Sequence, residues 1–394
     1  MLEQQDHYKS PNLDVVVALI CRPAGSPVPN ELNGTWYTEA EYLVAIRPHG
    51  KYRGLLEFPG GKVERGETQF AALAREVHEE VGLEVLAAHP LFEVTVLPVD
   101  NDSPNARLFV WQVSNWRGQA FGAEQQAIEW QRLNWHLQPR FLATNRHFLT
   151  RLQLGPWLAV VNVSLSDDNR QIRLKQWAQL NNGPTVRLRL MDPKEPMAMP
   201  ALAALVEHVL YYCEQANPNT LVIDVLPGHW QAFTVAMRAS AVVGIFLPSV
   251  WQDPANSAEL TQLLTDVKTL DRKLLIGAAC HNKVELEWAF AAQTGPQADF
   301  CMLSQVNVSN THPDRPALGW AEFAHLSRGY QQACYALGGM QMRDFETAMA
   351  HGAAGIAAIE GFAITASDFV EQRSTVVAAL NQVSHQPSLQ VPNL

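Results

Sequence analysis

Charged side chains are scarce in this chain of 394 residues, since Asp, Glu, Lys and Arg together make up only 17%. Basic residues are the scarcer sign: 29 Lys and Arg stand against 39 Asp and Glu, a formal net charge of −10 at pH 7. This acidic balance disfavours a general surface for a polyphosphate backbone, so we expect no nucleic acid polymer as a partner. A metal site on such a chain can still bind a small anion.

Long apolar runs are missing as well, and cysteine is sparse. No run reaches the length of a membrane span and residues 1–13 are polar, so we expect neither a span nor a signal peptide. The five cysteines include no C-x-x-C pair, which predicts reduced thiols in the cytoplasm. They are Cys21, Cys213, Cys280, Cys301 and Cys334. With 47% apolar residues, the chain is long enough for two domains with cores.

One segment carries an ordered set of acidic residues. Apolar side chains recur at helical spacing over 68–81, and Gly82 follows, so we expect an amphipathic helix that ends at this glycine. On that helix Glu76, Glu79 and Glu80 stand at i, i+3 and i+4 and share one face. Three carboxylates on one face favour a hard divalent cation, Mg²⁺ or alternatively Mn²⁺.

A glycine turn precedes this helix. The apolar run 56–58 leads into Pro-Gly-Gly at 59–61, where glycine permits positive φ and a close approach of the backbone. We expect N–H or C=O groups of this turn to face a metal or a phosphate. Arg75 is next to Glu76 in sequence, and we expect it to orient that carboxylate or to neutralise charge.

Residues 61–83 resemble the Nudix box, G-x5-E-x7-R-E-(apolar)-x-E-E-x-G-(apolar), at every specified position. An isolated pair of glutamates would indicate only a solvated helix face, but a match over the whole motif favours a site. The resemblance implies a hydrolase that cleaves a diphosphate bond, with Arg75 and the three helix glutamates as catalytic residues. It implies a metal site built from Gly61, Glu76, Glu79, Glu80 and Glu124.

Within that family, residues 14–152 resemble the MutT branch. The resemblance lies in EFPGGK at 57–62, in W-R-G and F-G-A-E-Q between 116 and 125, and in A-T-N at 143–145. It implies pyrophosphohydrolysis of a nucleoside triphosphate, with 8-oxo-dGTP cleaved to 8-oxo-dGMP and pyrophosphate. Such an activity cleans the nucleotide pool and is related to DNA repair.

The MutT resemblance also implies the residues of the nucleotide site. Glu124 would join the metal site or its water, and the nucleotide would be bound by Arg47, Glu57, Phe58 and Asn145. Two plainer roles stay open, since Glu124 could be an ordinary loop acid and Asn145 a helix cap. Residues 102–105 depart from the branch, because they lack the basic residue usual just before the next strand.

Apolar, β-rich runs surround the box helix, as in the mixed sheet of the Nudix family. We expect strands at 14–21, 42–46, 91–97, 107–113 and 129–133. Residues 23–33 are rich in Pro, Gly and Asn and predict a long loop. We therefore expect an α/β chain whose residues 1–152 form a MutT-like Nudix α/β/α domain.

After residue 156, short apolar runs alternate with helical stretches. We expect strands at 157–163, 185–190, 220–225, 242–247, 273–278, 299–303, 333–337 and 355–359, and helices at 201–214, 259–270 and 344–351. Eight such units predict a TIM-type (β/α)8 barrel over 156–385, followed by a frayed tail, 386–394. Gly338, Gly339 and Gly361 follow the last two strands, where such barrels often bind phosphate.

This second half resembles thiamine-phosphate synthase and its TenI-like relatives, most clearly over 273–362. The resemblance rests mainly on G-A-A-C-H at 277–281, Y-A-L-G-G-M at 335–340 and H-G-A-A-G at 351–355. Residues that the synthase reaction needs are replaced: Asp224-Val225 stands for Asn-Asp, Phe246 for a histidine and His312 for a lysine. The resemblance therefore implies a degenerate barrel.

Three alternatives to a plain MutT-like enzyme follow from this combination. The barrel could bind a thiamine-related phosphate and regulate or scaffold the hydrolase. The chain could be bifunctional, which the lost charges disfavour. The Nudix site could instead cleave a thiamine-pathway diphosphate or a nucleotide sugar. We interpret His281 and His312 as packing or hydrogen-bonding residues.

Overall fold

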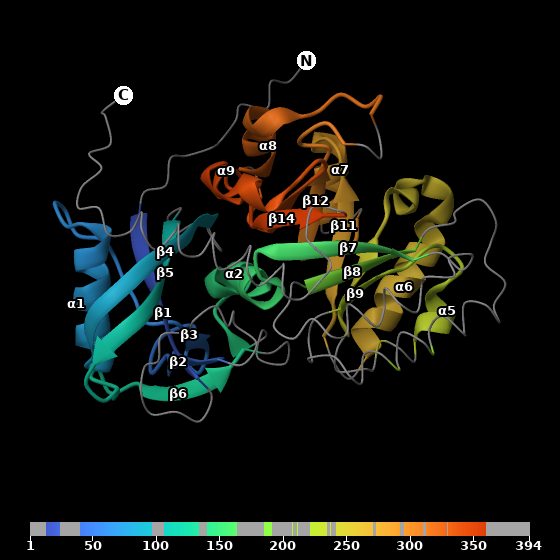
Figure 1. Cartoon of the computed structure of the whole chain (residues 1–394). Helices are drawn as coiled ribbons and strands as arrows, with labels where there is room; N and C mark the ends of the chain where they lie inside the picture. Colours follow the sequence, from blue (N-terminus) through green and yellow to red (C-terminus); the bar gives the residue numbers. More distant parts are fainter. Residues whose placement is uncertain are drawn as a thin grey trace, which may run out of the picture. The chain divides into compact units, whose positions relative to one another are not determined.

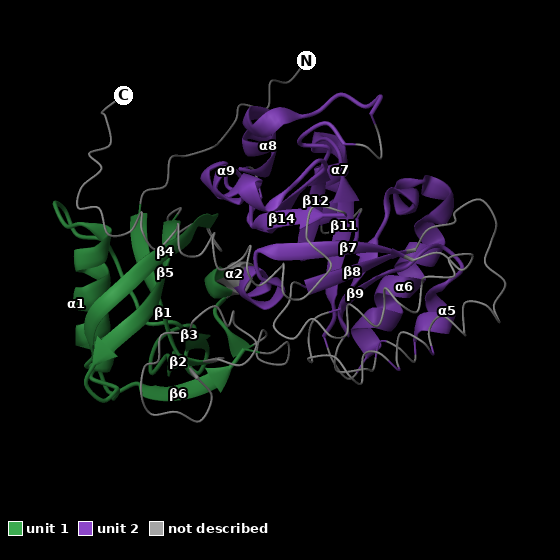
Figure 2. Ribbon diagram, in the orientation of Figure 1, with its two compact units in different colours: residues 1–33, 39–133, 137–147 green, residues 34–38, 134–136, 148–394 purple. Residues whose placement is uncertain are grey.

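The chain folds into two compact units, seen in a computed structural model (Figures 1 and 2). The described residues up to 147 form the first unit, and those from 148 onward form the second. The structure describes residues 13–23, 40–96, 106–133, 140–163, 185–190, 207, 211, 221–234, 237, 242–270, 273–291, 295–309, 313–328 and 330–359. No helix within these ranges has both the length and the apolar character that crossing a membrane requires.

The first unit is built on a mixed sheet in the order β3-β2-β1-β5-β4, with β6 paired to β2. Its strands are β1 (Leu13–Pro23), β2 (Ala40–Ile46), β3 (Leu56–Glu57), β4 (Glu84–Val96), β5 (Ala106–Arg117) and β6 (Ala127–Arg132). Only the β1–β5 pairing is parallel, and the others are antiparallel. The mixed sheet expected for this half of the chain is therefore confirmed.

Helix α1 (Gln69–Val81) packs its apolar face on this sheet. It begins after Thr68, whose hydroxyl accepts a hydrogen bond from Ala71 N at 3.2 Å, and ends at Gly82 in the left-handed conformation (φ 68°). Leu73, Val77 and Val81 are fully buried in the core with side chains of β1 and β5. The predicted helix and its glycine end are confirmed, and its polar face is left open for the acidic residues.

The second unit is a closed barrel of parallel strands in the order β10-β11-β12-β13-β14-β7-β8-β9. The strands are β7 (Trp157–Val163), β8 (Thr185–Leu190), β9 (Leu221–Asp224), β10 (Val242–Leu247), β11 (Leu275–Cys280), β12 (Phe300–Ser304), β13 (Ala333–Leu337) and β14 (Gly355–Ala358). All eight expected strands are present, and the TIM-type fold class is confirmed.

Helices follow most of these strands. They are α2 (Ala143–Leu154) before the barrel, then α5 (Trp230–Phe233), α6 (Ser257–Thr269), α7 (Lys283–Phe290), α8 (Gly319–Ser327) and α9 (Phe345–Ala350). Single 3-10 turns are η3 (Ser249–Gln252), η4 (Pro254–Asn256) and η5 (Met342–Asp344). The helices expected at 259–270 and 344–351 are confirmed with small shifts, whereas most of 201–214, the loop 24–33, Gly361 and the tail 386–394 lie outside the described residues.

A buried ion pair occupies the barrel interior. Arg187 on β8 donates two hydrogen bonds to the carboxylate of Asp224 on β9, at 2.7 and 3.0 Å. Its guanidinium also lies 3.5 Å from the ring centroid of Phe246 and 3.4 Å from the sulfur of Met302. Since β8 and β12 are not neighbours in the barrel, the contact with Met302 crosses the interior. Phe246 and Met302 belong to an apolar cluster of the barrel that also includes Phe300.

Candidate active site on the box helix

The glycine turn is held against the sheet by backbone hydrogen bonds to β1. Val16 N donates to Gly61 O at 2.9 Å, and Ala18 N donates to Pro59 O at 2.8 Å. These bonds direct two carbonyls of the turn towards β1. The N–H of Gly60 points the other way and donates to the carboxylate of Glu80 at 3.0 Å. The turn therefore faces the helix glutamates with an N–H group.

Gly61 is required by close packing against Glu76. A Cβ built at Gly61 would overlap all three atoms of the Glu76 carboxylate, although the backbone of Gly61 is not left-handed. Any larger residue would therefore displace that carboxylate or the turn itself. The first glycine of the box and its first helix glutamate therefore pack directly against each other.

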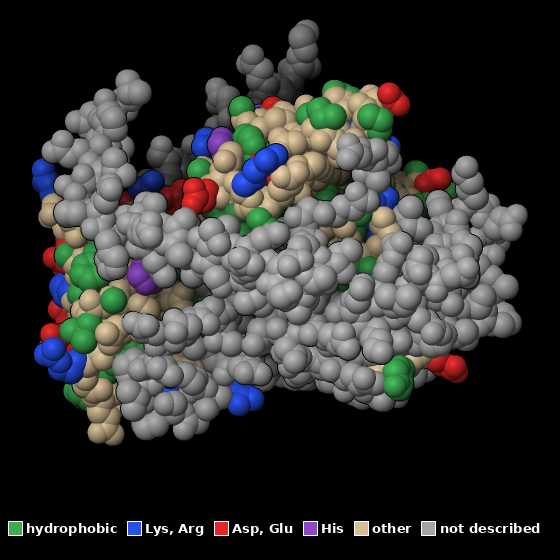
Figure 3. All heavy atoms as spheres, viewed as in Figure 1, with side chains coloured by type: hydrophobic (Ala, Val, Ile, Leu, Met, Phe, Trp, Pro, Cys, Tyr) green, Lys and Arg blue, Asp and Glu red, His purple; other side chains and the backbone are tan. Residues whose placement is uncertain are grey.

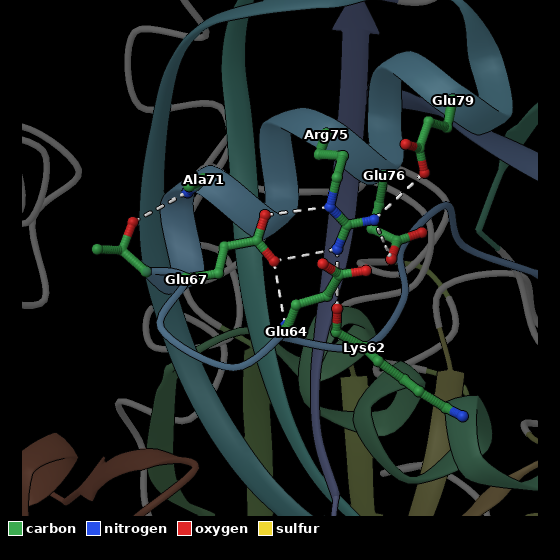
Figure 4. A network of polar contacts seen from close by, with 8 residues as sticks. Lys62, Glu64, Glu67, Ala71, Arg75, Glu76 and Glu79 are labelled. Atoms are coloured by element: carbon green, nitrogen blue, oxygen red, sulfur yellow. Dashed lines mark hydrogen bonds and ion pairs between the residues drawn. The ribbon is translucent and has the colours of Figure 1, made fainter.

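Arg75 binds the other acidic residues of the box, as Figure 4 shows. Its Nε and Nη2 donate to the two carboxylate oxygens of Glu67, each at 3.1 Å. Its Nη1 donates to Glu76 at 2.8 Å and to Glu79 at 3.2 Å, and Nη2 also donates to Lys62 O at 3.0 Å. The guanidinium lowers the pKa of Glu67, because it hydrogen bonds to the ionised form. The expected contact of Arg75 with Glu76 is thus present, as part of a larger network.

Glu80 has a different environment from Glu76 and Glu79, although it shares their helix. Burial is the main cause that raises the pKa of Glu80 to about 8, and the hydrogen bond from Gly60 N opposes this shift. The negative charges of Glu57, Glu76 and Glu124 raise it further. Four carboxylates from three separate segments are therefore close enough to repel one another.

This carboxylate group suits a hard divalent cation by its chemistry. Oxygen donors are the ligands that Mg²⁺ and Mn²⁺ prefer, and a cation would relieve the repulsion that raises the pKa of Glu80. Within the described residues, no three His, Cys, Asp or Glu side chains are arranged to hold a metal as they stand. On the face shown in Figure 3, carboxylates of this unit alternate with Lys and Arg side chains along its edge.

The loop after β5 brings Glu124 to the end of the helix. Ala123 N donates to Glu80 O at 2.9 Å, and Phe121 N donates to Val81 O at 3.2 Å. The side chain of Gln126 bonds both the helix end and the loop. Its Nε2 donates to Glu80 O at 2.8 Å, and its Oε1 accepts from Glu124 N at 2.9 Å. Sequence reasoning missed Gln126, since a single glutamine in a loop carries no recognisable pattern.

The expected nucleotide-binding residues lie beside the turn. Arg47 donates to the Glu57 carboxylate at 2.6 Å. Burial raises the pKa of Glu57, with the charge of Arg47 opposing the shift. Phe58 is buried and stacks on Phe141 with 5.2 Å between ring centroids. Asn145, in the first turn of α2, accepts a hydrogen bond from Phe58 N at 3.4 Å, so its side chain contacts the turn that carries Glu57.

The residues expected to bind phosphate on the barrel are only partly described. Gly338 and Gly339, after β13, both have left-handed backbones, with φ of 100° and 65°. Gly338 O accepts a hydrogen bond from Asn307 N at 3.1 Å. Gly361 and His312 lie outside the described residues, and His281 Nδ1 lies 2.8 Å from the carboxylate of Glu285.

Comparison with known families matches each unit separately. The NUDIX domain model matches residues 15–152, and the model described as thiamine monophosphate synthase matches residues 258–362. The second match covers strands β11 to β14 of the barrel together with the helices between them.

Two curated relatives come from Escherichia coli (strain K12). An 8-oxo-dGTP diphosphatase is 43% identical over 79 residues, which is 20% of this chain and 58% of the relative. A CTP pyrophosphohydrolase is 34% identical over 93 residues, which is 23% of this chain and 67% of the relative. The chain thus spans little more than half the length of the 8-oxo-dGTP diphosphatases of E. coli and Haemophilus influenzae, at 58% and 53%.

Among solved structures, a thiamine phosphate pyrophosphorylase from Pyrococcus furiosus is similar to the barrel. It is 16% identical, and the match covers 59% of this chain and 98% of that chain with a TM-score of 0.40. The fold of the second unit is established by its strand pairing rather than by this likeness.

Proposed function

The chain belongs to the Nudix family through residues 15–152, and we propose that it hydrolyses the diphosphate linkage of a nucleoside triphosphate with a divalent cation, Mg²⁺ or Mn²⁺. The observation that carries this proposal is the group of carboxylates around Glu80, set against the glycine turn. Glu76, Glu80 and Glu124 would hold the cation, with Glu57 and Glu79 close by. The cation, when bound, would supply positive charge to the phosphates and lower the pKa of a bound water.

Each protein residue has a separate task in this proposal. The Arg75 network fixes the direction of the Glu76 carboxylate. Glu80 accepts a hydrogen bond from Gly60 N, which holds its carboxylate against the glycine turn. Arg47 and Asn145 flank Glu57 and Phe58 and would bind the nucleotide.

For the substrate we propose 8-oxo-dGTP, cleaved to 8-oxo-dGMP and pyrophosphate. The similarity of the chain to 8-oxo-dGTP diphosphatases supports this choice, and its similarity to a CTP pyrophosphohydrolase makes CTP the pyrimidine nucleotide to test beside it. Product analysis separates this reaction from loss of the terminal phosphate, because the former yields a monophosphate and pyrophosphate. A thiamine diphosphate and a nucleotide sugar belong in the same panel.

Two matched substitutions test the site. We expect Glu76→Gln and Glu80→Gln to lower kcat at saturating Mg²⁺ by about 100-fold or more, since a ligand or proton acceptor is lost. Glu84→Gln is the control, because Glu84 lies on β4 outside the box helix and its exposed carboxylate bonds the exposed Arg117. Turnover near wild type in both site variants would reject the assignment.

For the barrel we propose binding of a thiamine-related phosphate without synthesis. The adjacent left-handed glycines after β13 and the family match over 258–362 support binding. The interior Arg187–Asp224 pair supports loss of the synthase reaction, because Asp224, which stands where the synthases have Asn-Asp, has its charge paired with Arg187. Calorimetry with thiamine phosphate tests this, and the absence of both heat and a thermal shift would reject it.

A further inference from the structure

Gln126 is a polar side chain at the candidate site that belongs to no part of the box. It is 8% exposed, so its amide must find partners within the protein. Each partner is a backbone group with a single role: the carbonyl of Glu80 can only accept a hydrogen bond, and the N–H of Glu124 can only donate one. Exchanging the amide oxygen and nitrogen would oppose like groups at both contacts, so the orientation of the side chain is determined.

These two bonds connect the two segments that carry Glu80 and Glu124. Glu80 is in the last turn of α1, where backbone carbonyls lack partners within the helix. Its carbonyl accepts from both Ala123 N at 2.9 Å and Gln126 Nε2 at 2.8 Å. The other end of the same amide holds the backbone of Glu124 at 2.9 Å. One side chain therefore links the helix end to the backbone of Glu124, in addition to the backbone bond from Ala123.

The loop needs such a bond because its backbone conformation is unfavourable. Gln125, between Glu124 and Gln126, has φ 68°, a left-handed conformation that side chains other than glycine rarely adopt. Gly122 packs so closely on Gln126 that a Cβ there would overlap Gln126 O. Contacts from outside the turn must therefore hold it in this conformation.

We propose that Gln126 is a positioning residue that places the Glu124 carboxylate beside Glu80, and that it thereby sets the affinity of the site for its divalent cation. This inference rests on the proposed function for the identity of the bound ion. Both polar atoms of the Gln126 side chain are bonded to backbone groups, so Gln126 would act through the segment that bears Glu124 rather than as a ligand.

The test measures Mn²⁺ binding to the full chain by calorimetry without nucleotide, next to the Mg²⁺ dependence of turnover. Gln126→Leu removes both bonds, and we expect Mn²⁺ to bind about 10-fold to 100-fold more weakly, as for the loss of other groups that orient ligands. We expect kcat at saturating Mg²⁺ to change much less than the half-saturating Mg²⁺ concentration. Gln131→Leu is the matched control, because the Gln131 amide bonds Glu129 in β6, outside the loop.

A double-mutant cycle separates positioning from general weakening of the fold. If Gln126 acts through Glu124, then Gln126→Leu should have little further effect on Mn²⁺ binding in a Glu124→Gln background. Gln126→Met, of similar length, replaces the leucine variant if that variant does not fold. Binding within threefold of wild type, or an equal loss in both backgrounds, would overturn the inference.

The two proposals fail in different ways. A wild-type chain that binds Mn²⁺ but hydrolyses no nucleotide would reject the proposed function and leave the role of Gln126 to be decided by the binding data. A wild-type chain that hydrolyses nucleotides but binds no Mn²⁺ without them would overturn the inference and spare the proposed function.

Discussion

At the scale of single residues, Arg75 is notable because all five of its N–H donors are used. They bind three glutamates and one backbone carbonyl. A lysine has three donors on one nitrogen and cannot span these partners. The geometry of the guanidinium, rather than its charge alone, therefore holds Glu76 in place.

We expect Arg75→Lys to lower kcat/KM by about 10-fold to 100-fold, the usual effect of removing a group that orients a ligand. Steady-state kinetics at saturating Mg²⁺ measure this effect. Arg117→Lys, which alters the exposed pair with Glu84, serves as the control. A lysine variant with wild-type kcat/KM would show that only the charge matters.

Gly61 and Gly66 make a matched pair of glycines for a second prediction. Gly61→Ala should reduce turnover by about 100-fold, because the new methyl group overlaps the Glu76 carboxylate and misplaces a group on which the reaction depends. Gly66 has φ 84° and open space around it, so Gly66→Ala should cost about 1 kcal/mol of stability and keep activity. Kinetics and urea unfolding of both variants measure the contrast. Equal activity in the two would contradict it.

At the scale of elements, α1 depends on its two ends. Thr68→Ala removes the hydroxyl that accepts from Ala71 N, and we expect a loss of about 1 kcal/mol of stability. Thr68→Ser keeps this hydrogen bond and should retain most of the stability. Urea unfolding of the three chains gives the comparison. If serine and alanine cost the same, the cap does not stabilise the helix.

The elements also show why sequence predicts some parts well. The strands β7, β10 and β13 have the predicted bounds, because buried parallel strands are short, mainly apolar runs with clear ends. Strand β8 also has the predicted bounds, although Arg187 and Arg189 alternate there with apolar residues. Strand β4 starts at Glu84, seven residues before the predicted start at 91. Its first half contains Ala87, Ala88 and Pro90, which are poor strand formers, and it pairs with β5 through shifts in register that sequence patterns do not contain.

In the candidate site, too, some features could be predicted from the sequence and others could not. The box spacing predicts the helix, its carboxylates and the glycine turn, since these are local in sequence. The separation of Glu80 from the Arg75 network depends on the position of Gly60 against β1, which only the folded sheet determines. The bonds of Gln126 depend on the path of the loop after β5 and could not be predicted.

At the scale of the whole molecule, each unit has apolar clusters of its own among the residues that the structure describes. The apolar cluster around α1 contains only residues of the first unit, and the two barrel clusters contain only residues of the second. Stability and activity should therefore respond to different substitutions. The buried pair in the barrel provides a test of this separation.

We expect Arg187→Met to destabilise the barrel by about 3–5 kcal/mol, because the buried Asp224 carboxylate would lose both hydrogen bonds and the ion pair with Arg187. Arg187→Met combined with Asp224→Leu should recover much of this loss, since no buried charge of the pair remains. Urea unfolding measures both, and nucleotide turnover at 25 °C should stay near wild type. A parallel fall in turnover would show that the units are coupled.

Because the glycine turn is hydrogen bonded to β1, opening of the site can be followed by hydrogen exchange at two buried amides of that strand. The amides of Val16 and Ala18 are bonded to carbonyls of the turn, and both residues are fully buried. Their exchange with deuterium requires the turn to detach from the strand. The protection of these two core amides thus reports the free energy of opening of the site, with no probe placed in the site itself.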